Sequence, residues 1–281
     1  MRFTLISILL LSLFFSSCKK DEDTEQDMPV TMLNVSYGTN AQQKMDVYLP
    51  ASRNTTSTKV IIMIHGGGWN TGDKADFNEY VDSLKKREPS YAIFNINYRL
   101  ANTTDLFPAQ EQDVKAAIEF INSKRQEYQL SGKFVLIGAS AGGHLALLQG
   151  YKYNTPVKPK AIIDFFGPTD LVTLYNNPPN PLVQPTLLAV TGGTPTTNNT
   201  LYTQSSPINF VSSQSPPTMI LHGGIDIVVS PSQSVSLDTK LFISGVTHQY
   251  VFYPAEGHGW VGANLTDSFN KILAFLAANV D

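Results

Sequence analysis

The residues from Gly138 to Gly142 place a single hydroxyl among small side chains. They read Gly-Ala-Ser-Ala-Gly and follow the apolar run 134–137. A Gly-x-Ser-x-Gly pattern between a strand and a helix is the nucleophile elbow, where the serine takes a strained backbone conformation that tolerates only small neighbours. An ordinary glycine-rich turn is the alternative. We interpret Ser140 as a candidate nucleophile.

A serine hydroxyl is a weak nucleophile until a base accepts its proton and an acid orients that base. After a nucleophile elbow, the acid follows next in the chain and the histidine comes last. Asp226 and His258 satisfy this order, and each follows a short apolar run within a glycine-containing turn. The sequence therefore predicts a triad of Ser140, Asp226 and His258. Asp170, which also follows an apolar run, is the alternative acid; taken singly, Asp226 could be a turn residue and His258 a surface histidine.

Three consecutive glycines supply a second part of this chemistry. Residues 65–69 read His-Gly-Gly-Gly-Trp and follow the apolar run 60–64. Glycines allow backbone N–H groups to approach the oxygen of a substrate carbonyl, and a helix N-terminus presents further N–H groups. We predict that the N–H groups of Gly67, Gly68 and Ala141 form an oxyanion hole. A flexible turn is the alternative.

Two tryptophans closely follow glycine-rich motifs. These are Trp69 and Trp260, and we expect both to line the acyl pocket. The five histidines show no spacing typical of metal ligands. The sequence therefore predicts no metal and no cofactor.

Other polar residues are interpreted as structural. His65 and His222 belong to glycine turns and are expected to brace loops, and His144 is expected to be packed and hydrogen-bonded rather than catalytic. Arg99 and Asp113 are interpreted as a structural pair, with Asp113 near a helix start, where a carboxylate is favoured.

Short apolar runs separated by helical patterns indicate how these residues are positioned. The expected strands lie at 30–35, 44–49, 60–64, 91–96, 134–137, 161–166, 218–221 and 250–253. Helical spacing of apolar residues occurs at 113–120, 234–243 and 265–276. Continuous apolar strands between helices indicate an α/β fold with a mostly parallel sheet covered on both faces. Sites in such sheets form beyond the carboxyl ends of the strands.

Residues 168–217 interrupt this alternation, because they are rich in proline, asparagine and threonine. A loop of this length inside a compact domain is usually functional or carries small helices of its own. An insertion over the site and a decorated surface loop are equally compatible with the sequence.

Length and composition favour one globular domain. The chain has 281 residues, of which 42% are hydrophobic and 15% charged, and its net charge is −3. A single α/β domain of this size can bury a large core, and we assign it to residues 30–281. The body of the chain has no basic block, so the sequence predicts no binding to nucleic acid.

The N-terminal segment is expected to be a targeting signal rather than part of the fold. A positive start, a short apolar stretch and small residues predict a signal peptide at 1–17, with Cys18 as the lipidated residue of a bacterial lipoprotein. An ordinary cleaved signal with an incidental cysteine is the alternative. Polar residues at 18–29 are expected to form a tether. The segment that ends at Cys18 resembles a bacterial lipobox, and residues 19–23 resemble the acidic segment that routes some lipoproteins to the outer surface; these resemblances imply an outer membrane lipoprotein that faces the periplasm or the cell surface.

The chain resembles α/β-hydrolases of the esterase/lipase group, which include hormone-sensitive-lipase-like enzymes and a bacterial feruloyl-esterase-like branch. The resemblance covers most of residues 30–281. Its motifs are HGGGW at 65–69, NYRL at 97–100, FPAQEQDV at 107–114, GASAGGHLA at 138–146, SPINFV at 206–211, HGGID at 222–226 and GHGW at 257–260. Ala139 is a departure, because the hormone-sensitive-lipase-like enzymes usually have aspartate there. This departure favours the feruloyl-esterase-like branch.

The resemblance implies a carboxylic ester hydrolase that forms an acyl-enzyme, with short-chain or carbohydrate-linked esters, such as acetyl or feruloyl esters, as substrates. An amidase or peptidase of the same fold is one alternative, although such peptidases usually carry a large extra N-terminal domain and only about thirty residues precede the first expected strand here. An inactive surface binding lipoprotein is the other. Such a protein is expected to lack a triad residue, and the sequence has all three.

Overall fold

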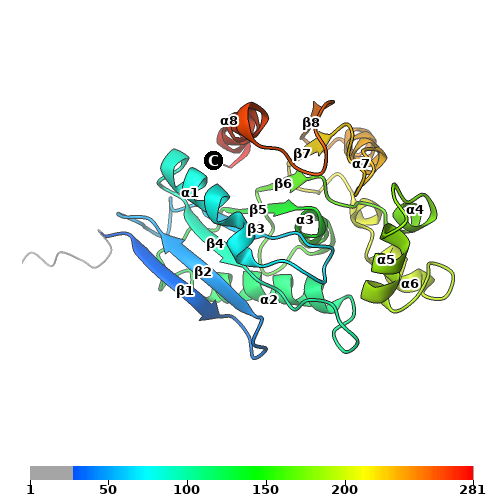
Figure 1. Cartoon of the computed structure of the whole chain (residues 1–281). Helices are drawn as coiled ribbons and strands as arrows, with labels where there is room; N and C mark the ends of the chain where they lie inside the picture. Colours follow the sequence, from blue (N-terminus) through cyan, green and yellow to red (C-terminus); the bar gives the residue numbers. More distant parts are fainter. Residues whose placement is uncertain (1–27, 281) are drawn as a thin grey trace, which may run out of the picture.

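The computed structural model describes residues 28–280, and within them eight strands form one sheet (Figure 1). The spatial order of the strands is β1-β2-β4-β3-β5-β6-β7-β8. Their bounds are β1 Val30–Ser36, β2 Lys44–Leu49, β3 Val60–Ile64, β4 Ala92–Ile96, β5 Phe134–Ala139, β6 Ala161–Phe165, β7 Thr218–Gly223 and β8 His248–Tyr253.

The sheet is mostly parallel, as the apolar runs predict. β2 pairs antiparallel with both β1 and β4, whereas every other neighbouring pair is parallel. All residues of β3 and β4 are buried, because helices cover both faces of these central strands. The carboxyl ends of β5, β7 and β8 therefore lie along the same edge of the sheet, where side chains from distant parts of the sequence can meet.

Helices cover the two faces of the sheet and bury two separate apolar clusters. The larger cluster includes side chains of α2 (Ala109–Ser123), α3 (Ala141–Lys152) and α7 (Ser232–Ile243). The other cluster includes side chains of α1 (Asn78–Arg87) and α8 (Gly262–Asn279). A 3₁₀ helix, η2 (Lys74–Phe77), precedes α1.

Residues 168–217 carry short helices of their own. These are α4 (Leu171–Asn176), α5 (Val183–Thr191), α6 (Asn199–Gln204) and the 3₁₀ helix η3 (Pro207–Phe210). They lie beside the sheet, on the right in Figure 1. Apolar side chains of α4, α5 and α6, including Leu174, Leu187 and Tyr202, belong to the larger core cluster. The segment is therefore anchored to the domain.

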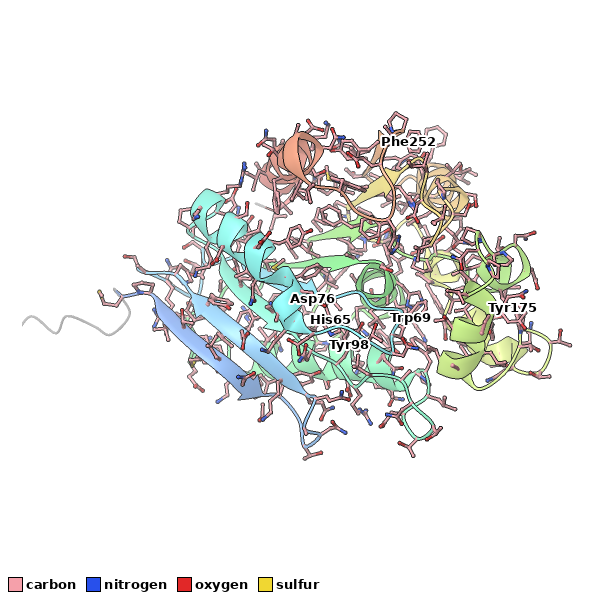
Figure 2. All side chains as sticks on the ribbon, viewed as in Figure 1. His65, Trp69, Asp76, Tyr98, Tyr175 and Phe252 are labelled. Atoms are coloured by element: carbon pink, nitrogen blue, oxygen red, sulfur yellow. The ribbon has the colours of Figure 1, made fainter. Side chains whose placement is uncertain are left out.

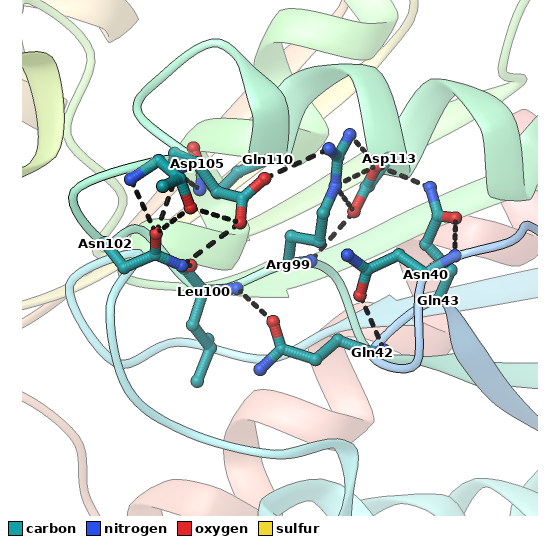
Figure 3. A network of polar contacts seen from close by, with 10 residues as sticks. Asn40, Gln42, Gln43, Arg99, Leu100, Asn102, Asp105, Gln110 and Asp113 are labelled. Atoms are coloured by element: carbon teal, nitrogen blue, oxygen red, sulfur yellow. Dashed lines mark hydrogen bonds and ion pairs between the residues drawn. The ribbon is translucent and has the colours of Figure 1, made fainter.

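A partly buried polar network fixes the loop between β4 and α2 (Figure 3). The Arg99 guanidinium donates to Asp113 Oδ1 at 2.7 Å and to Asp105 Oδ1 at 3.2 Å, and Gln43 Nε2 donates to Asp113 Oδ1 at 2.7 Å. This contact confirms the predicted pairing of Arg99 with Asp113. The expected position of Asp113 near a helix start is wrong, because α2 begins at Ala109 and Asp113 lies in its second turn.

The architecture confirms the predicted α/β-hydrolase fold. Residues 28–280 contain no helix that is long and apolar enough to cross a membrane. The predicted signal peptide at 1–17, Cys18 and nearly all of the predicted tether lie outside the described residues.

Candidate active site

Ser140 stands at the turn between β5 and α3 in a conformation that few residues adopt. Its φ and ψ are 54° and −121°. The turn is so tight that a Cβ atom on Gly138 would come within 2.2 Å of the carbonyl oxygen of Gly142. A Cβ on Gly142 would lie 2.0 Å from the carbonyl oxygen of Ile64, at the end of β3. The small neighbours of Ser140 are therefore required by close backbone contacts, and the turn presents the hydroxyl at the edge of the sheet.

Three of the predicted residues meet at this edge, from the ends of three strands. His258, in the loop after β8, has its Nε2 atom 2.9 Å from Ser140 Oγ. The Nδ1 atom of the same ring lies 2.7 Å from Asp226 Oδ2, in the loop after β7. With Nδ1 protonated, Nε2 is free to accept the serine proton. The phenyl ring of Phe166 packs on the imidazole with a centroid distance of 4.5 Å.

The Asp226 carboxylate is held by several hydrogen-bond donors. Oδ1 accepts the backbone N–H groups of Val228 and Val229 at 2.7 and 3.0 Å. Oδ2 lies 2.7 Å from His258 Nδ1 and 3.2 Å from His222 Nε2. Burial disfavours the charged carboxylate, but the hydrogen bonds from His222 and His258 outweigh it and hold the pKa of Asp226 well below its usual range. Asp226 therefore stays ionised beside the imidazole.

The predicted oxyanion-hole residues lie in the loop after β3 and at the start of α3, and Gly68 lines the same cavity as Ser140. Gly67 and Gly68 have φ values of 101° and 56°. The carbonyl oxygen of Gly67 accepts the N–H and the hydroxyl of Thr71 at 2.9 and 2.8 Å, which fixes the turn. Among the residues that the structure describes, the N–H groups of Gly67 and Gly68 have no protein acceptor. Ala141 is the first residue of α3, and its N–H has no acceptor within the helix.

An aromatic pair supports the start of this glycine loop. His65 stacks on Tyr98 with a centroid distance of 4.4 Å, and Figure 2 labels both residues close to Trp69. The Tyr98 hydroxyl is within hydrogen-bond distance of the carbonyl oxygens of His65 and Gly66, at 3.0 and 3.2 Å. Burial lowers the pKa of His65. These contacts agree with the expectation that His65 braces a loop.

His144 joins the glycine loop to the helix of the elbow. Its Nδ1 accepts the indole N–H of Trp69 at 3.1 Å, and its Nε2 lies 2.7 Å from the carbonyl oxygen of Ser205. The ring therefore donates from Nε2, and burial lowers its pKa to about 4, so it is neutral at pH 7. His144 is packed and hydrogen-bonded, as the sequence predicts.

A cavity of about 210 Å³ opens beside Ser140. Gly68 and Trp69 line one side, so the structure brings Trp69 to the candidate nucleophile as expected. The inserted segment supplies much of the remaining wall through Pro168, Leu174, Asn180, Leu182, Val183, Thr186 and Leu187. The segment at 168–217 therefore contributes directly to the space in front of the serine.

The polar side chains that the insertion adds to this wall bond to the protein itself. Asn180 donates to the carbonyl oxygen of Ile227 at 2.6 Å and accepts the N–H of Leu182 at 2.8 Å. The hydroxyl of Thr186 donates to the carbonyl oxygen of Leu182 at 2.8 Å. The insertion therefore presents a predominantly apolar surface to the cavity.

The structure places Trp260 away from this cavity, which corrects the expectation that it lines the pocket of the serine. Its indole N–H donates to Ser268 Oγ at 2.9 Å, and its ring packs on Phe166 and Tyr253. Trp260 lines a separate apolar space between the sheet and helices α1 and α8. The backbone turns at Gly259, where φ is 110°, between His258 and Trp260.

Asp170, the alternative acid, has a different set of partners. Its carboxylate caps the N-terminus of α4 by accepting the N–H of Thr173 at 3.0 Å and the Thr173 hydroxyl at 2.6 Å. Its backbone N–H and carbonyl oxygen bond to the side chain of Gln233. The structure therefore brings Asp226 and not Asp170 to His258.

Two kinds of residue at this site were not predicted from the sequence. Apolar residues of the insertion carry no chemical motif, so no signal in the sequence identifies them as walls of the cavity. His222 was expected only to brace a loop, yet its ring reaches the carboxylate of Asp226. Its position four residues before Asp226 in HGGID was the available signal.

Comparison with known proteins assigns the family. The family described as BD-FAE matches residues 45–241, which include Ser140 and Asp226. The chain belongs to the BD-FAE family. His258 lies beyond the matched residues, in the loop after β8.

Similar proteins include named esterases. The chain is 26% identical to esterase LipC of Mycobacterium tuberculosis over 86% of its length, and it spans 64% of the length of LipC. It is 29% identical over 72% of its length to LipM of the same organism, a probable carboxylic ester hydrolase of which it spans 49%.

Solved structures show the same fold. A truncated form of a carbohydrate esterase from gut microbiota is 25% identical, with a TM-score of 0.74, and the match covers 90% of this chain and 98% of that one. A bifunctional GH43-CE protein of Bacteroides eggerthii is 27% identical, with a TM-score of 0.76, and the match covers 90% of this chain and 38% of that protein.

Proposed function

We propose that this protein is a serine carboxylic ester hydrolase that works through an acyl-enzyme. The observation that carries the proposal is the chain of contacts from Ser140 Oγ to His258 Nε2 and from His258 Nδ1 to Asp226, at 2.9 and 2.7 Å. A serine with φ of 54° at a strand-to-helix turn adds to this support. The similarity to LipC and LipM points to the same reaction.

In this mechanism Ser140 Oγ attacks the ester carbonyl while His258 Nε2 accepts its proton. The carbonyl oxygen gains negative charge, which the N–H groups of Gly67, Gly68 and Ala141 stabilise. The imidazolium returns the proton to the departing alcohol, leaving the acyl group on the serine. Water then attacks this acyl-serine ester by the same sequence of proton transfers, which releases the acid and restores the hydroxyl.

The test of the reaction is Ser140→Ala, assayed for kcat on p-nitrophenyl acetate. Loss of a nucleophilic serine in a triad lowers kcat by about 10⁶-fold, so turnover should fall to near background. Circular dichroism should match the wild type, because alanine fits wherever serine does. Retained turnover in a folded Ser140→Ala protein would contradict the assignment of the nucleophile.

We propose uncharged acyl groups as substrates, from acetyl to short-chain and feruloyl, with carbohydrate as one possible alcohol. The apolar wall from the insertion and the carbohydrate esterases among the similar structures support this proposal. Purified protein should hydrolyse p-nitrophenyl acetate, p-nitrophenyl butyrate, acetylated xylan or methyl ferulate faster than esters whose acyl group carries a carboxylate. A preference for the charged acyl group would contradict the proposal.

We also propose that Cys18 carries a lipid anchor that holds the domain at the outer membrane. A single acyl chain binds membranes only marginally, so stable anchoring needs more than one. Radiolabelled palmitate should enter the wild-type protein but not Cys18→Ser, and the variant should move to the soluble fraction. Absence of label in the wild type would favour an ordinary cleaved signal.

A further inference from the structure

His222 is a fully buried histidine at the end of β7, and both of its ring nitrogens have partners. Nδ1 lies 2.7 Å from the hydroxyl oxygen of Ser234 in α7, which is also fully buried. Nε2 lies 3.0 Å from the carbonyl oxygen of Val229 and 3.2 Å from Asp226 Oδ2. The ring therefore spans the space between α7 and the candidate triad acid.

These partners determine which nitrogen of His222 carries a proton. A carbonyl oxygen and a carboxylate oxygen only accept hydrogen bonds, so Nε2 must donate. Nδ1 can then accept the hydroxyl proton of Ser234, which makes the neutral ring compatible with all of its neighbours. The opposite neutral tautomer would place the Nε2 lone pair against two oxygen acceptors. The oxygen atoms of Val229 and Asp226 thus fix the tautomer in which Nε2 carries the proton, and Ser234 supplies the donor for Nδ1.

The Nε2–H group of His222 hydrogen-bonds to the Val229 carbonyl oxygen and also faces the same oxygen atom of Asp226 that His258 uses. Asp226 Oδ2 lies 2.7 Å from His258 Nδ1 and 3.2 Å from His222 Nε2. The backbone N–H groups of Val228 and Val229 hold only Oδ1. Apart from His258 itself, His222 is thus the group that restrains Oδ2 among the described residues.

We propose that His222 is a positioning residue for ester hydrolysis, which keeps Asp226 Oδ2 in line with His258 Nδ1. The proposal rests on the proposed mechanism of Ser140, His258 and Asp226. His222 does not line the cavity in front of the serine, so we expect it to act through Asp226. Its N–H also withdraws part of the carboxylate charge from His258.

The surroundings of His222 contain one further acidic group. Asp164 of β6 is fully buried, its Oδ1 accepts the N–H of Gly167 at 3.0 Å, and its charge interacts with His222. Burial raises the pKa of Asp164 to about 7. The other groups that face the ring are Ser234, Asp226, the carbonyl oxygen of Val229 and the ring of Phe166, which lies at a centroid distance of 6.4 Å. Asp164 is therefore the neighbour whose titration must be separated from the effect of His222.

The experiment compares His222→Leu, His222→Gln and a matched control. Leucine removes the donor, whereas the terminal amide of glutamine can still donate at the position of Nε2. His248→Gln is the control, because His248 also pairs with a carboxylate, that of Asp238 at 3.4 Å, but lies on the edge strand away from the triad. Each variant is measured for kcat and KM on p-nitrophenyl acetate between pH 5 and pH 9.

Loss of a hydrogen bond to a charged group changes a rate or equilibrium constant by a factor of about 10 to 100. We expect His222→Leu to lower kcat by about this factor with little change in KM, and His222→Gln to recover most of the loss. The acid limb of kcat/KM should move to higher pH in His222→Leu, because a less neutralised carboxylate favours the imidazolium form of His258. The downfield proton resonance of His258 Nδ1–H should shift as well.

Ser234→Ala keeps the test decisive if His222→Leu does not fold. Without the hydroxyl, Nδ1 of His222 loses its hydrogen-bond donor and the ring is less well held, so the same resonance should shift and kcat should fall, but less than in His222→Leu. The inference is wrong if folded His222→Leu and Ser234→Ala keep the wild-type kcat and pH profile while Ser140→Ala is inactive. It is also wrong if Asp164→Asn moves the acid limb and neither of those variants does. Retained turnover in Ser140→Ala would instead reject the proposed function itself.

Discussion

Asp226→Asn tests the proposed acid most sharply, because the structure leaves an amide no suitable orientation. If the amide oxygen takes the place of Oδ2, the NH₂ group faces the N–H groups of Val228 and Val229, which lie 2.7 and 3.0 Å from Oδ1. If the NH₂ group takes the place of Oδ2, it faces His258 Nδ1 and His222 Nε2. Both orientations set donors against donors.

The two orientations lower kcat for different reasons. In the first, the imidazolium that forms during attack loses its negative partner. In the second, His258 must protonate Nε2 instead of Nδ1, and it can no longer accept a proton from Ser140. The corresponding change in a serine protease lowers kcat by ~10⁴-fold, and we expect a loss of that order. Each buried donor left without an acceptor costs about 1–3 kcal/mol, so the Tm should fall by roughly 4–8 °C or more.

Asp170→Asn is the matched control, because Asp170 also follows a strand end. Asparagine is as good an N-cap as aspartate, so this change should alter stability by less than about 0.5 kcal/mol and leave kcat within about twofold. The assay is kcat on p-nitrophenyl butyrate, with Tm from circular dichroism. If Asp170→Asn is inactive while Asp226→Asn keeps its rate, the acid is misassigned.

Three further predictions follow from contacts around the site. Gly142→Ala should destabilise the fold by about 3 kcal/mol or more, because its Cβ would meet the Ile64 carbonyl oxygen, whereas Gly257→Ala, with no atom within 4 Å, should leave the Tm unchanged. Burial raises the pKa of Asp164 to about 7, so the folded protein retains a proton that the unfolded chain loses above about pH 4, and the free energy of unfolding falls as pH rises between these values. The Tm of Asp164→Asn minus the Tm of the wild type should therefore be larger at pH 8 than at pH 5. An equal difference at both pH values would contradict this. Thr186→Phe should narrow the cavity and lower kcat/KM for p-nitrophenyl hexanoate more than for the acetate; equal losses would show that the acyl group lies elsewhere.

Much of the fold could be predicted because its central strands are short, apolar and regularly spaced. The run at 60–64 is wholly buried as β3, and the run at 134–137 extends two residues further as β5. The nucleophile elbow at Ser140 could be predicted because close backbone contacts admit only glycine at positions 138 and 142. Such steric requirements are local, and they leave a direct trace in the sequence.

Features that depend on tertiary packing left weaker traces. Helix α1 was not predicted, because only Val81 and Leu84 of its ten residues are buried and most of its other side chains are polar or charged. The direction of Trp260 depends on the turn at Gly259 and on contacts with α8. The cavity walls come from a proline-rich segment. Its short helices are stabilised by packing against the core of the domain rather than by their own helix propensity.

The place of β8 at the border of the sheet determines when hydrolysis becomes possible during folding. His258 lies 118 residues after Ser140, and its loop follows β8, which forms one edge of the sheet. Contacts between residues so far apart form only after long loops have closed, which is entropically costly. A chain in which β8 has not paired holds the serine without its base and is inert toward esters. Recovery of turnover after denaturation therefore reports completion of the border strand, not formation of the central core.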